Sequence, residues 1–300
     1  MVRLTPSVQQ ITANTSVVQK APISCISTPI LLIPLVLLVL LKIQPMKLKD
    51  YLVTVILPVY NASKFLPECL ESLKEQSYKD IQIIAIDDHS RDNSPAILRK
   101  FKKDFKQLEI LRNKKRYGTA ICYNRALKRA QGRFVAFMNP NDINAVSRFK
   151  RQVNFLINHP KTVAVGTQFT SIDANAKKLE RSKLPEDHEP IYDTILSAST
   201  LKPETVMVDR KMLPKDLLYF KHNKYPLVFT EVFVKFFQYG KVANIAQSLY
   251  FHREGVKKYE RTNSKLKKTI AMAKLWWKSR SNYDYKPSLK ISLPAMLRNA

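Results

Sequence analysis

Cysteine is scarce in this sequence, which has only Cys25, Cys69 and Cys122 in 300 residues. Their small number and wide spacing exclude a disulfide framework and a cysteine-ligated metal knuckle. Cys69 and Cys122 fall on positions typical of buried helix faces, so we expect both to be core residues. The sequence also lacks zinc-finger spacing and the aromatic and basic strand motif of an RNA-recognition domain. Nucleic acid is therefore not the partner that the sequence favours.

Acidic residues are also scarce relative to basic ones. Lys and Arg number 51 and Asp and Glu number 24, a net charge of +27. No acid occurs between Glu109 and Asp142, where eight basic residues lie: Arg112, Lys114, Lys115, Arg116, Arg125, Lys128, Arg129 and Arg133. This surplus is typical of a protein with a polyanionic partner, such as an anionic membrane surface or phosphate-bearing ligands. A solvated basic surface is the alternative.

Charge is absent from Ala21 to Leu41, and this stretch is strongly aliphatic from Ile30 onward. About twenty apolar residues are needed to span a bilayer. We therefore predict a short N-terminal segment over residues 1–20 and a membrane anchor over residues 21–43. A buried strand and helix is the alternative, whereas a cleaved signal peptide fits poorly because no small-residue cleavage site follows.

The flanking charges predict how this anchor is oriented. Lys42, Lys47 and Lys49 follow it closely, and the rest of the chain is strongly basic, whereas only Arg3 and Lys20 precede it. By the positive-inside rule, the main domain then lies in the cytoplasm. The sequence thus predicts a membrane-associated protein with a cytoplasmic main domain.

Strand and helix patterns alternate from residue 51 onward. Short apolar runs typical of buried parallel strands occur at 52–57, 81–86, 108–111 and 134–138. Helical spacing of apolar residues follows each run, at 66–73, from 94 onward, at 120–130 and at 146–157. This alternation predicts an α/β domain over residues 51–255, with a Rossmann-like, mostly parallel sheet and helices on both faces.

Polar residues follow three of these predicted strands. Pro58 to Asn61 follows the first, Asp87 and Asp88 end the second, and Asn139 to Asp142 follows the fourth. Each segment alone could be a turn or a helix cap. Ligands of such sheets bind at the carboxyl ends of the strands. Three polar loops converging on one edge therefore predict a binding site.

The order of these motifs resembles the family-two, inverting glycosyltransferases. The resemblance rests on the strand and loop Val53–Asn61, the helix Phe65–Leu73, the turn Gln76–Tyr78 and the run Ile86–Ser94. It continues through Gly118, Asn124, Gly132, Arg148 and Gln152. The resemblance implies a GT-A fold and transfer of a sugar from a nucleotide-diphosphate-sugar donor to a saccharide or lipid-linked acceptor.

The resemblance also implies which residues hold the donor. In the family, the Pro-x-Tyr-Asn loop and the second aspartate of the Asp-Asp-x-Ser turn hold the nucleobase and ribose. A carboxylate suits the base because it accepts hydrogen bonds from an N–H group, and basic side chains can offset the diphosphate charge. The expected nucleotide-binding residues are Pro58, Tyr60, Asn61, Asp87, Asp88, Arg116, Gly118 and Asn124.

The chain departs from the family at the position of the metal ligands. The family usually has Asp-x-Asp-Asp after the fourth strand, where carboxylates hold Mg²⁺ or Mn²⁺. Here the run is Asn139-Pro140-Asn141-Asp142, so only Asp142 keeps its charge. Because an amide oxygen is a poorer ligand for a hard dication than a carboxylate, a Mg²⁺ or Mn²⁺ cofactor is doubtful.

A second departure concerns the catalytic base. The family carries Glu-Asp at the start of a later helix, and its aspartate deprotonates the acceptor. Here Glu231 is kept, but Val232 occupies the position of the base and cannot take a proton. Two hypotheses follow: an active enzyme in which Glu231 or Asp142 acts catalytically, or an impaired relative that binds nucleotide sugars or serves as a scaffold. A third, a nucleic-acid or anionic-lipid binder, rests on charge alone.

The last segment, residues 256–300, leaves the family pattern and is predicted to be a basic amphipathic tail. Leu266, Ile270, Ala273 and Trp277 line one face of a predicted helix, and lysines occupy much of the rest. A basic amphipathic helix with tryptophan is typical of an element that lies on a membrane surface. The alternative is that the apolar stripe packs on the domain.

Overall fold

The computed structural model of the chain describes residues 51–197, 200–221, 227–256, 265–288, 290 and 292. The N-terminal segment 1–20 and the predicted anchor 21–43 lie outside these residues. All described residues belong to one compact unit, Lys47–Ala300. None of the helices within the described ranges is long and apolar enough to cross a membrane.

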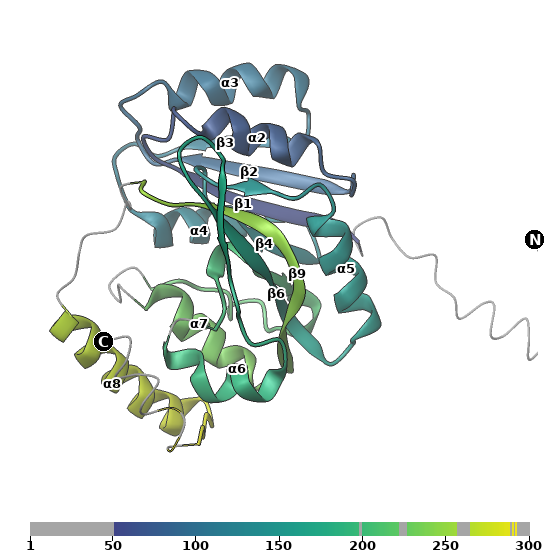
Figure 1. The fold of residues 1–300 in the computed structure, drawn as a ribbon. Helices are drawn as coiled ribbons and strands as arrows, with labels where there is room; N and C mark the ends of the chain where they lie inside the picture. Colours follow the sequence, from purple (N-terminus) through teal and green to yellow (C-terminus); the bar gives the residue numbers. More distant parts are fainter. Residues whose placement is uncertain are drawn as a thin grey trace, which may run out of the picture. The chain divides into compact units, whose positions relative to one another are not determined.

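The first half of the domain is the predicted alternation of strands and helices (Figure 1). The strands β1 (Val53–Val59), β2 (Ile81–Asp87), β3 (Leu108–Arg112) and β4 (Phe134–Phe137) are joined by α2 (Leu66–Lys74), α3 (Ser94–Asp104) and α4 (Thr119–Leu127). These strands lie side by side in the order β3, β2, β1, β4, and all their pairings are parallel. The predicted α/β fold class and its helix and strand positions are thus confirmed here.

Beyond β4 the sheet becomes mixed. It continues through β8 (Met207–Asp209), β6 (Thr162–Ile172), β9 (Lys241–Arg253) and β5 (Ile143–Asn144), with β7 (Lys178–Arg181) paired to β6. Strand β8 is antiparallel to both β4 and β6, whereas β6 and β9 are parallel. Because β8 runs antiparallel to its neighbour β4, the segment just before β8 lies next to the carboxyl end of β4.

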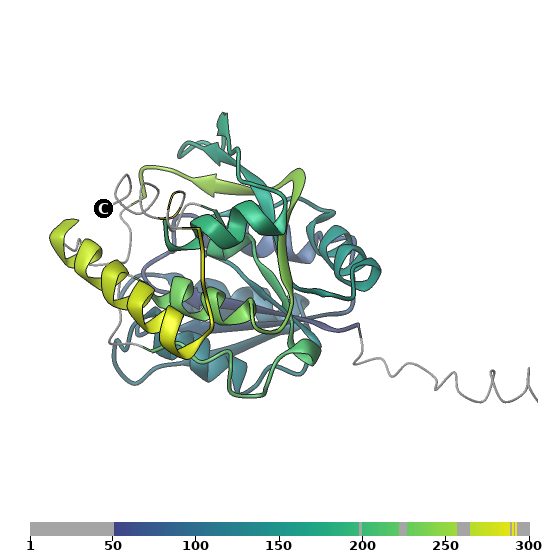
Figure 2. The same cartoon turned by 90° about the horizontal axis from the view of Figure 1, so that it is seen from below.

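The remaining helices are α5 (Arg148–Asn158), α6 (His188–Thr194), α7 (Val228–Phe236) and α8 (Lys265–Asn282), with short 3₁₀ helices η2 (Ile195–Ser197), η3 (Pro203–Thr205) and η4 (Arg210–Met212). Helix α8 lies beside α7 in both views (Figures 1 and 2). The tail predicted from residue 256 onward therefore contains a helix that contacts the domain.

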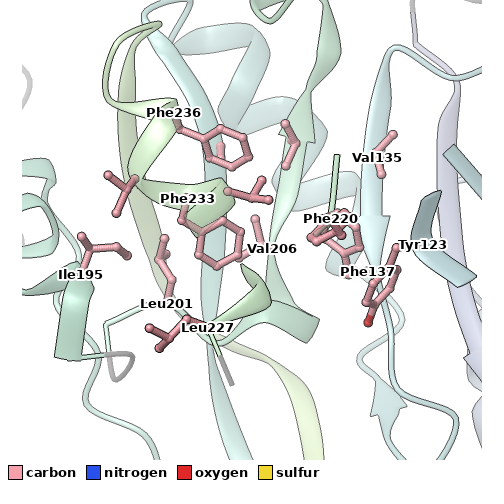
Figure 3. Close-up of a cluster of buried hydrophobic side chains, with 14 of the residues drawn as sticks. Tyr123, Val135, Phe137, Ile195, Leu201, Val206, Phe220, Leu227, Phe233 and Phe236 are labelled. Carbon is pink, nitrogen blue, oxygen red and sulfur yellow. The ribbon is translucent and has the colours of Figure 1, made fainter. Parts of the chain in front are cut away.

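Buried side chains form one apolar cluster on each face of the sheet. The alternating residues Val53, Val55 and Leu57 of β1 point into the cluster covered by α2, α3 and α5. Ile56 points to the other face, which packs against α4, α6, α7 and α8. This alternation is the two-residue period of a strand buried on both sides. The second cluster is rich in aromatic rings, as Figure 3 shows for Tyr123, Phe137, Phe220, Phe233 and Phe236.

Gly132 and two cysteines have clear packing roles. Gly132 lies against β1, where an added Cβ would come within 2.8 Å of the backbone nitrogen of Thr54, so a side chain does not fit there. Cys69 and Cys122 are fully buried and free, which confirms that they are core residues.

Candidate active site

A cavity of about 730 Å³ lies at the carboxyl ends of β1, β2 and β4. It is where the three polar loops were predicted to converge. The loops contribute Pro58, Tyr60, Asn61, Asp88, Asn139, Asn141 and Asp142 to its wall. Arg116, Lys202, Glu204, His252, Arg253 and Glu254 line it as well.

The loop after β1 is held in place by the loop after β2. The backbone N–H groups of Asn61, Ala62 and Ser63 donate hydrogen bonds to the side chains of Ser90, Ser94 and Asp92, respectively. In return, Asn61 Oδ1 accepts a hydrogen bond from the backbone of Arg91, 2.9 Å away. Asn61 has φ +47°, a left-handed conformation that asparagine tolerates better than most residues. Asn61 therefore shapes the cavity wall as well as lining it.

Asp88 ties the cavity to a third loop, residues 113–118. Its Oδ1 accepts hydrogen bonds from Asn113 Nδ2 (2.5 Å) and the backbone of Tyr117 (2.9 Å), and its Oδ2 accepts one from the backbone of Gly118 (2.8 Å). Gly118 has φ +94°, a conformation that favours glycine. The carboxylate is only 2% exposed. Asp88 thus fixes the basic loop that contains Arg116.

Arg116 and Tyr60 are in contact at the wall of the cavity. The guanidinium carbon of Arg116 lies 4.3 Å from the centre of the Tyr60 ring, a cation–π contact. This contact brings a positive charge to the loop that the sequence assigned to the nucleotide. A phosphate-bearing ligand in the cavity would therefore meet a cation already held in position.

Two of the predicted nucleotide-binding residues have other contacts. Asp87 accepts a hydrogen bond from the backbone of Ser90, and Arg112 Nε lies 3.1 Å from its Oδ2. The Asn124 side chain both donates to and accepts from the backbone of Phe220, at 2.8 and 2.9 Å. Neither residue is among those that line the cavity. The structure therefore places Asp87 and Asn124 behind the site, where they support its loops.

The loop after β4 is bound tightly into the fold. Asn139 Oδ1 accepts a hydrogen bond from the backbone of Asn141, a typical Asx turn. Asp142 is 1% exposed and accepts three hydrogen bonds: Tyr250 Oη at 2.8 Å and His252 Nδ1 at 3.1 Å to Oδ2, and the backbone of Arg253 at 2.9 Å to Oδ1. Burial raises the pKa of Tyr250 well above its usual range, and Asp142 raises it further. Tyr250 therefore stays protonated and donates to Asp142.

These contacts do not fit a divalent metal. The carboxylate of Asp142 is already occupied by three donors, and Arg253 Nε donates to the carbonyl oxygen of Asn141 at 3.0 Å. A guanidinium beside this loop is positively charged and repels a cation. In the part of the chain that the structure describes, no group of three or more His, Cys, Asp or Glu residues is arranged to hold a metal ion.

Arg253 is a buried cation that the sequence reasoning did not single out. Its side chain is 0% exposed, and besides Asn141 it donates to the carbonyls of Asp173 and Ala174 and to Glu68 Oε2 at 2.6 Å. A buried arginine with every branch of its guanidinium bonded is a rigid structural element. It donates to the loop in which the resemblance placed metal-binding carboxylates.

A second buried arginine, Arg148, positions the segment before β8. It donates to the carbonyl oxygens of Phe137 (3.2 Å) and Glu204 (2.8 Å), and Gln152 Nε2 donates to the carbonyl of Thr205 (2.8 Å). Burial lowers the pKa of Arg148 to about 10, so it remains charged at neutral pH. The sequence marked Arg148 and Gln152 as family positions, but it did not indicate that they hold Glu204 at the cavity.

Glu231, the predicted catalytic candidate on α7, is not among the residues that line the cavity. Its Oε1 accepts a hydrogen bond from Lys278 Nζ at 2.8 Å and lies 3.6 Å from Lys221 Nζ. Its neighbour Val232 is 2% exposed within the apolar cluster. Glu231 therefore joins α7 to α8, and the structure does not bring it to the reaction site.

Helix α8 has one face that packs on the domain and another that is exposed. Met272 and Leu275 are buried in the apolar cluster, whereas Ile270 and Trp277 are 46% and 73% exposed. Ala273 and Lys274 are also exposed. The alternative in which the stripe of Ile270, Ala273 and Trp277 packs on the domain is therefore wrong for these residues.

Comparison with known proteins agrees with this architecture. The sequence model of glycosyl transferase family 2 matches residues 54–214. An Escherichia coli protein named UDP-Glc:alpha-D-GlcNAc-diphosphoundecaprenol beta-1,3-glucosyltransferase WfgD is 27% identical over 175 residues, which is 58% of this chain and 67% of that protein.

Two solved structures share the fold. Staphylococcus aureus TarS 1-349, in complex with UDP-GlcNAc, superposes with a TM-score of 0.66 at 19% identity, over 83% of this chain and 71% of that chain. Pyrobaculum calidifontis mannosyltransferase PcManGT, in complex with GDP-Man and Mn²⁺, superposes with a TM-score of 0.59 at 20% identity, over 88% of this chain and 75% of that chain. The predicted GT-A Rossmann-like fold is thus confirmed.

Proposed function

Because the chain belongs to glycosyl transferase family 2, a family of transferase enzymes, we propose that it moves a sugar from a nucleotide-diphosphate-sugar donor to a hydroxyl acceptor without using a metal ion. The observation that carries this proposal is the cavity itself. Loops that the family uses for the nucleotide line it, and Arg116 lies over Tyr60 on its wall. The proteins of similar fold that contain UDP-GlcNAc or GDP-Man support the class of donor.

The metal-free part of the proposal rests on the loop after β4. Asn139 and Asn141 are neutral, Asp142 is held by three donors, and Arg253 lies against the same loop. PcManGT contains Mn²⁺, but the described residues of this chain include no group of three or more His, Cys, Asp or Glu that could hold an ion. Arg116 and Lys202, which both line the cavity, supply positive charge for the diphosphate instead.

We propose a lipid-linked acceptor on an anionic membrane surface. The similar E. coli enzyme is named for a diphosphoundecaprenol acceptor. In this chain, α8 exposes Ile270 and Trp277 with Lys274 between them, which suits an element that inserts apolar side chains among anionic headgroups. The apolar segment 21–43 would add an anchor and keep the main domain on the cytoplasmic side.

A donor-turnover assay tests the transferase proposal. The protein is incubated with UDP-glucose, UDP-GlcNAc or GDP-mannose and with vesicles that contain GlcNAc-diphosphoundecaprenol, and the release of UDP or GDP and the glycolipid product are measured. We expect one donor to be consumed with matching product, at the same rate in EDTA as in Mn²⁺. The second candidate function, a binding or scaffold protein, is favoured by Val232 at the position of the base. Nucleotide binding without turnover of any donor would support it.

A vesicle-binding assay tests the membrane proposal. Protein that begins at Leu48 is sedimented with vesicles of phosphatidylglycerol or of phosphatidylcholine, as wild type and as Trp277→Ser. We expect binding to the anionic vesicles only, weakened about tenfold by the substitution because a tryptophan buries a large apolar area in the interface. Tyr219→Ser, which removes another exposed aromatic ring (51% exposed), serves as the control. Equal binding to both lipids, or no effect of Trp277→Ser, would contradict the proposal.

A further inference from the structure

The cavity holds four carboxylates, and two of them are already committed to the fold. Asp88 accepts hydrogen bonds from Asn113, Tyr117 and Gly118, and Asp142 accepts them from Tyr250, His252 and Arg253. The protein thus already supplies hydrogen-bond donors to both carboxylates. The other two carboxylates are therefore the candidates for a group that takes a proton from an acceptor.

The remaining two carboxylates differ in their surroundings. Glu254 is exposed, so water solvates its carboxylate. Glu204 lies on η3, and its Oε2 atom is fully buried without a hydrogen-bond partner among the described residues. Buried polar atoms usually find a partner, and an exception in a folded protein calls for an explanation. The side chain of Glu204 as a whole is 22% exposed and lines the cavity, so the hydroxyl of a substrate in the cavity can approach it.

The backbone of Glu204 is held firmly in place. Arg148 donates to its carbonyl oxygen at 2.8 Å, and Gln152 donates to the next carbonyl, that of Thr205, also at 2.8 Å. Both donors are fully buried. Lys202 Nζ lies 3.9 Å from Glu204 Oε2. The backbone of Glu204 is thus fixed at the cavity wall, with a lysine beside its carboxylate.

We propose that Glu204 is the general base of the transfer reaction, in place of the aspartate that Val232 replaces. This inference rests on the proposed function. The acceptor hydroxyl oxygen forms a bond to the anomeric carbon of the donor sugar, and the bond between that carbon and the diphosphate oxygen breaks. The nucleoside diphosphate leaves with the electron pair of the broken bond. The hydroxyl proton passes to the carboxylate of Glu204 and then to solvent.

The substitution Glu204→Gln tests this role, since it keeps the size of the side chain but removes its basicity. We expect the variant to bind UDP or GDP within about threefold of the wild type. We expect turnover with the hydroxyl acceptor to fall by about 10²- to 10⁴-fold, the range of general-base contributions. Glu180→Gln, the same change at an exposed residue of β7, should leave both quantities unchanged.

Turnover with azide as the acceptor distinguishes a general base from a residue that only binds the substrate or supports the fold. Azide is already an anion, so its attack on the donor releases no proton and needs no base. We expect azide to restore turnover in Glu204→Gln, with a glycosyl azide as the product, and we expect Glu204→Asp to keep partial activity.

Each other outcome has a definite meaning. If Glu204→Gln transfers sugar to hydroxyl acceptors at the wild-type rate, Glu204 is not the base, although the proposed function stands. If the variant instead shows a raised KM for the donor and no rescue by azide, Glu204 binds the sugar and the proposal is overturned. If the wild type binds nucleotide but consumes no donor, the chain has no base and the scaffold function holds. If the wild type binds no nucleotide, the proposed function itself fails.

Discussion

At the scale of single residues, the polar loops have two tasks, since they line the cavity and hold one another in place. Asp88 shows this most clearly, because its three hydrogen bonds go to Asn113, Tyr117 and Gly118. The resemblance predicted that Asp88 holds the nucleobase. The structure adds that Asp88 also orders the loop that carries Arg116, so its effect on binding is partly indirect.

The substitution Asp88→Asn should therefore weaken nucleotide binding. An amide cannot accept three hydrogen bonds as a carboxylate does, so the 113–118 loop loses its fixed position. We expect the free energy of UDP or GDP binding to become less favourable by about 1–3 kcal/mol. Isothermal titration calorimetry measures this change, with Asp104→Asn at the exposed end of α3 as the control. Unchanged affinity in Asp88→Asn would show that the loop does not contribute to the nucleotide site.

Restoring carboxylates to the loop after β4 should create metal sensitivity. Asp at position 139 can accept the hydrogen bond from the backbone of Asn141 as Asn139 does, so the fold tolerates Asn139→Asp with Asn141→Asp. We expect Mn²⁺ to tighten UDP binding about tenfold in this double variant and to have no effect on the wild type. Calorimetry with Mn²⁺ and with EDTA compares the two proteins. Equal affinities in the double variant would mean that Arg253 excludes the ion whatever the loop sequence.

Adding Val232→Asp to the Asn139→Asp and Asn141→Asp double variant should destabilise the fold. Val232 is 2% exposed within the apolar cluster, and an unpaired charge there is strongly destabilising. The sequence could show that the base was missing, because a valine cannot take a proton. It could not show Glu204 as a candidate, because the nearness of Glu204 to the cavity comes from the position of β8 beside β4.

At the scale of elements, local sequence patterns predicted the helices and strands of the first half of the domain well. Each predicted strand and helix from residue 52 to 157 corresponds to an observed one. Strands β1, β2 and β4 are buried on both faces and read as continuous apolar runs, which is the strongest pattern a strand can have. Strand β8 has three residues and β5 has two, too few to show a period. These two strands of the mixed half were therefore not predicted.

The junction between α7 and α8 gives Glu231 a structural role that its place in the sequence did not indicate. Burial alone would lower the pKa of Lys278, but hydrogen bonds to Glu231 and Tyr283 raise it above its usual value. A lysine whose pKa is raised on folding adds stability below its unfolded pKa, about 10.4, and loses it as the pH rises through the folded value. The pair therefore supports the fold across neutral pH, and the contribution of Lys278 is lost in strong alkali.

The substitution Glu231→Gln tests this structural role. We expect it to lower the free energy of unfolding by about 1–2 kcal/mol at pH 7, a modest effect because Lys278 is partly exposed and screened by water. The difference from the wild type should shrink above about pH 10.4, where the unfolded lysine loses its proton. Urea unfolding at pH 7 and pH 11 measures both quantities, while nucleotide affinity at pH 7 should not change. A large loss of turnover without a loss of stability would return Glu231 to the reaction site.

At the scale of the whole molecule, charge and fold point to the same function. The net charge of +27 suits a protein that handles a diphosphate donor at an anionic surface. Family 2 membership and the GT-A fold provide the nucleotide cavity. In this chain the buried Arg253 donates to the loop where the family usually carries metal-binding carboxylates, and Arg116 and Lys202 line the same cavity. The sequence indicated a change at this loop only through its two asparagines.

Titration of the wild-type protein with UDP and with GDP, each in Mn²⁺ and in EDTA, tests this account most directly. The account predicts that at least one nucleotide binds, and that its Kd agrees within about threefold between the two conditions, because protein cations rather than a metal ion meet the diphosphate. A hundredfold tightening by Mn²⁺, or the failure of both nucleotides to bind, would contradict it.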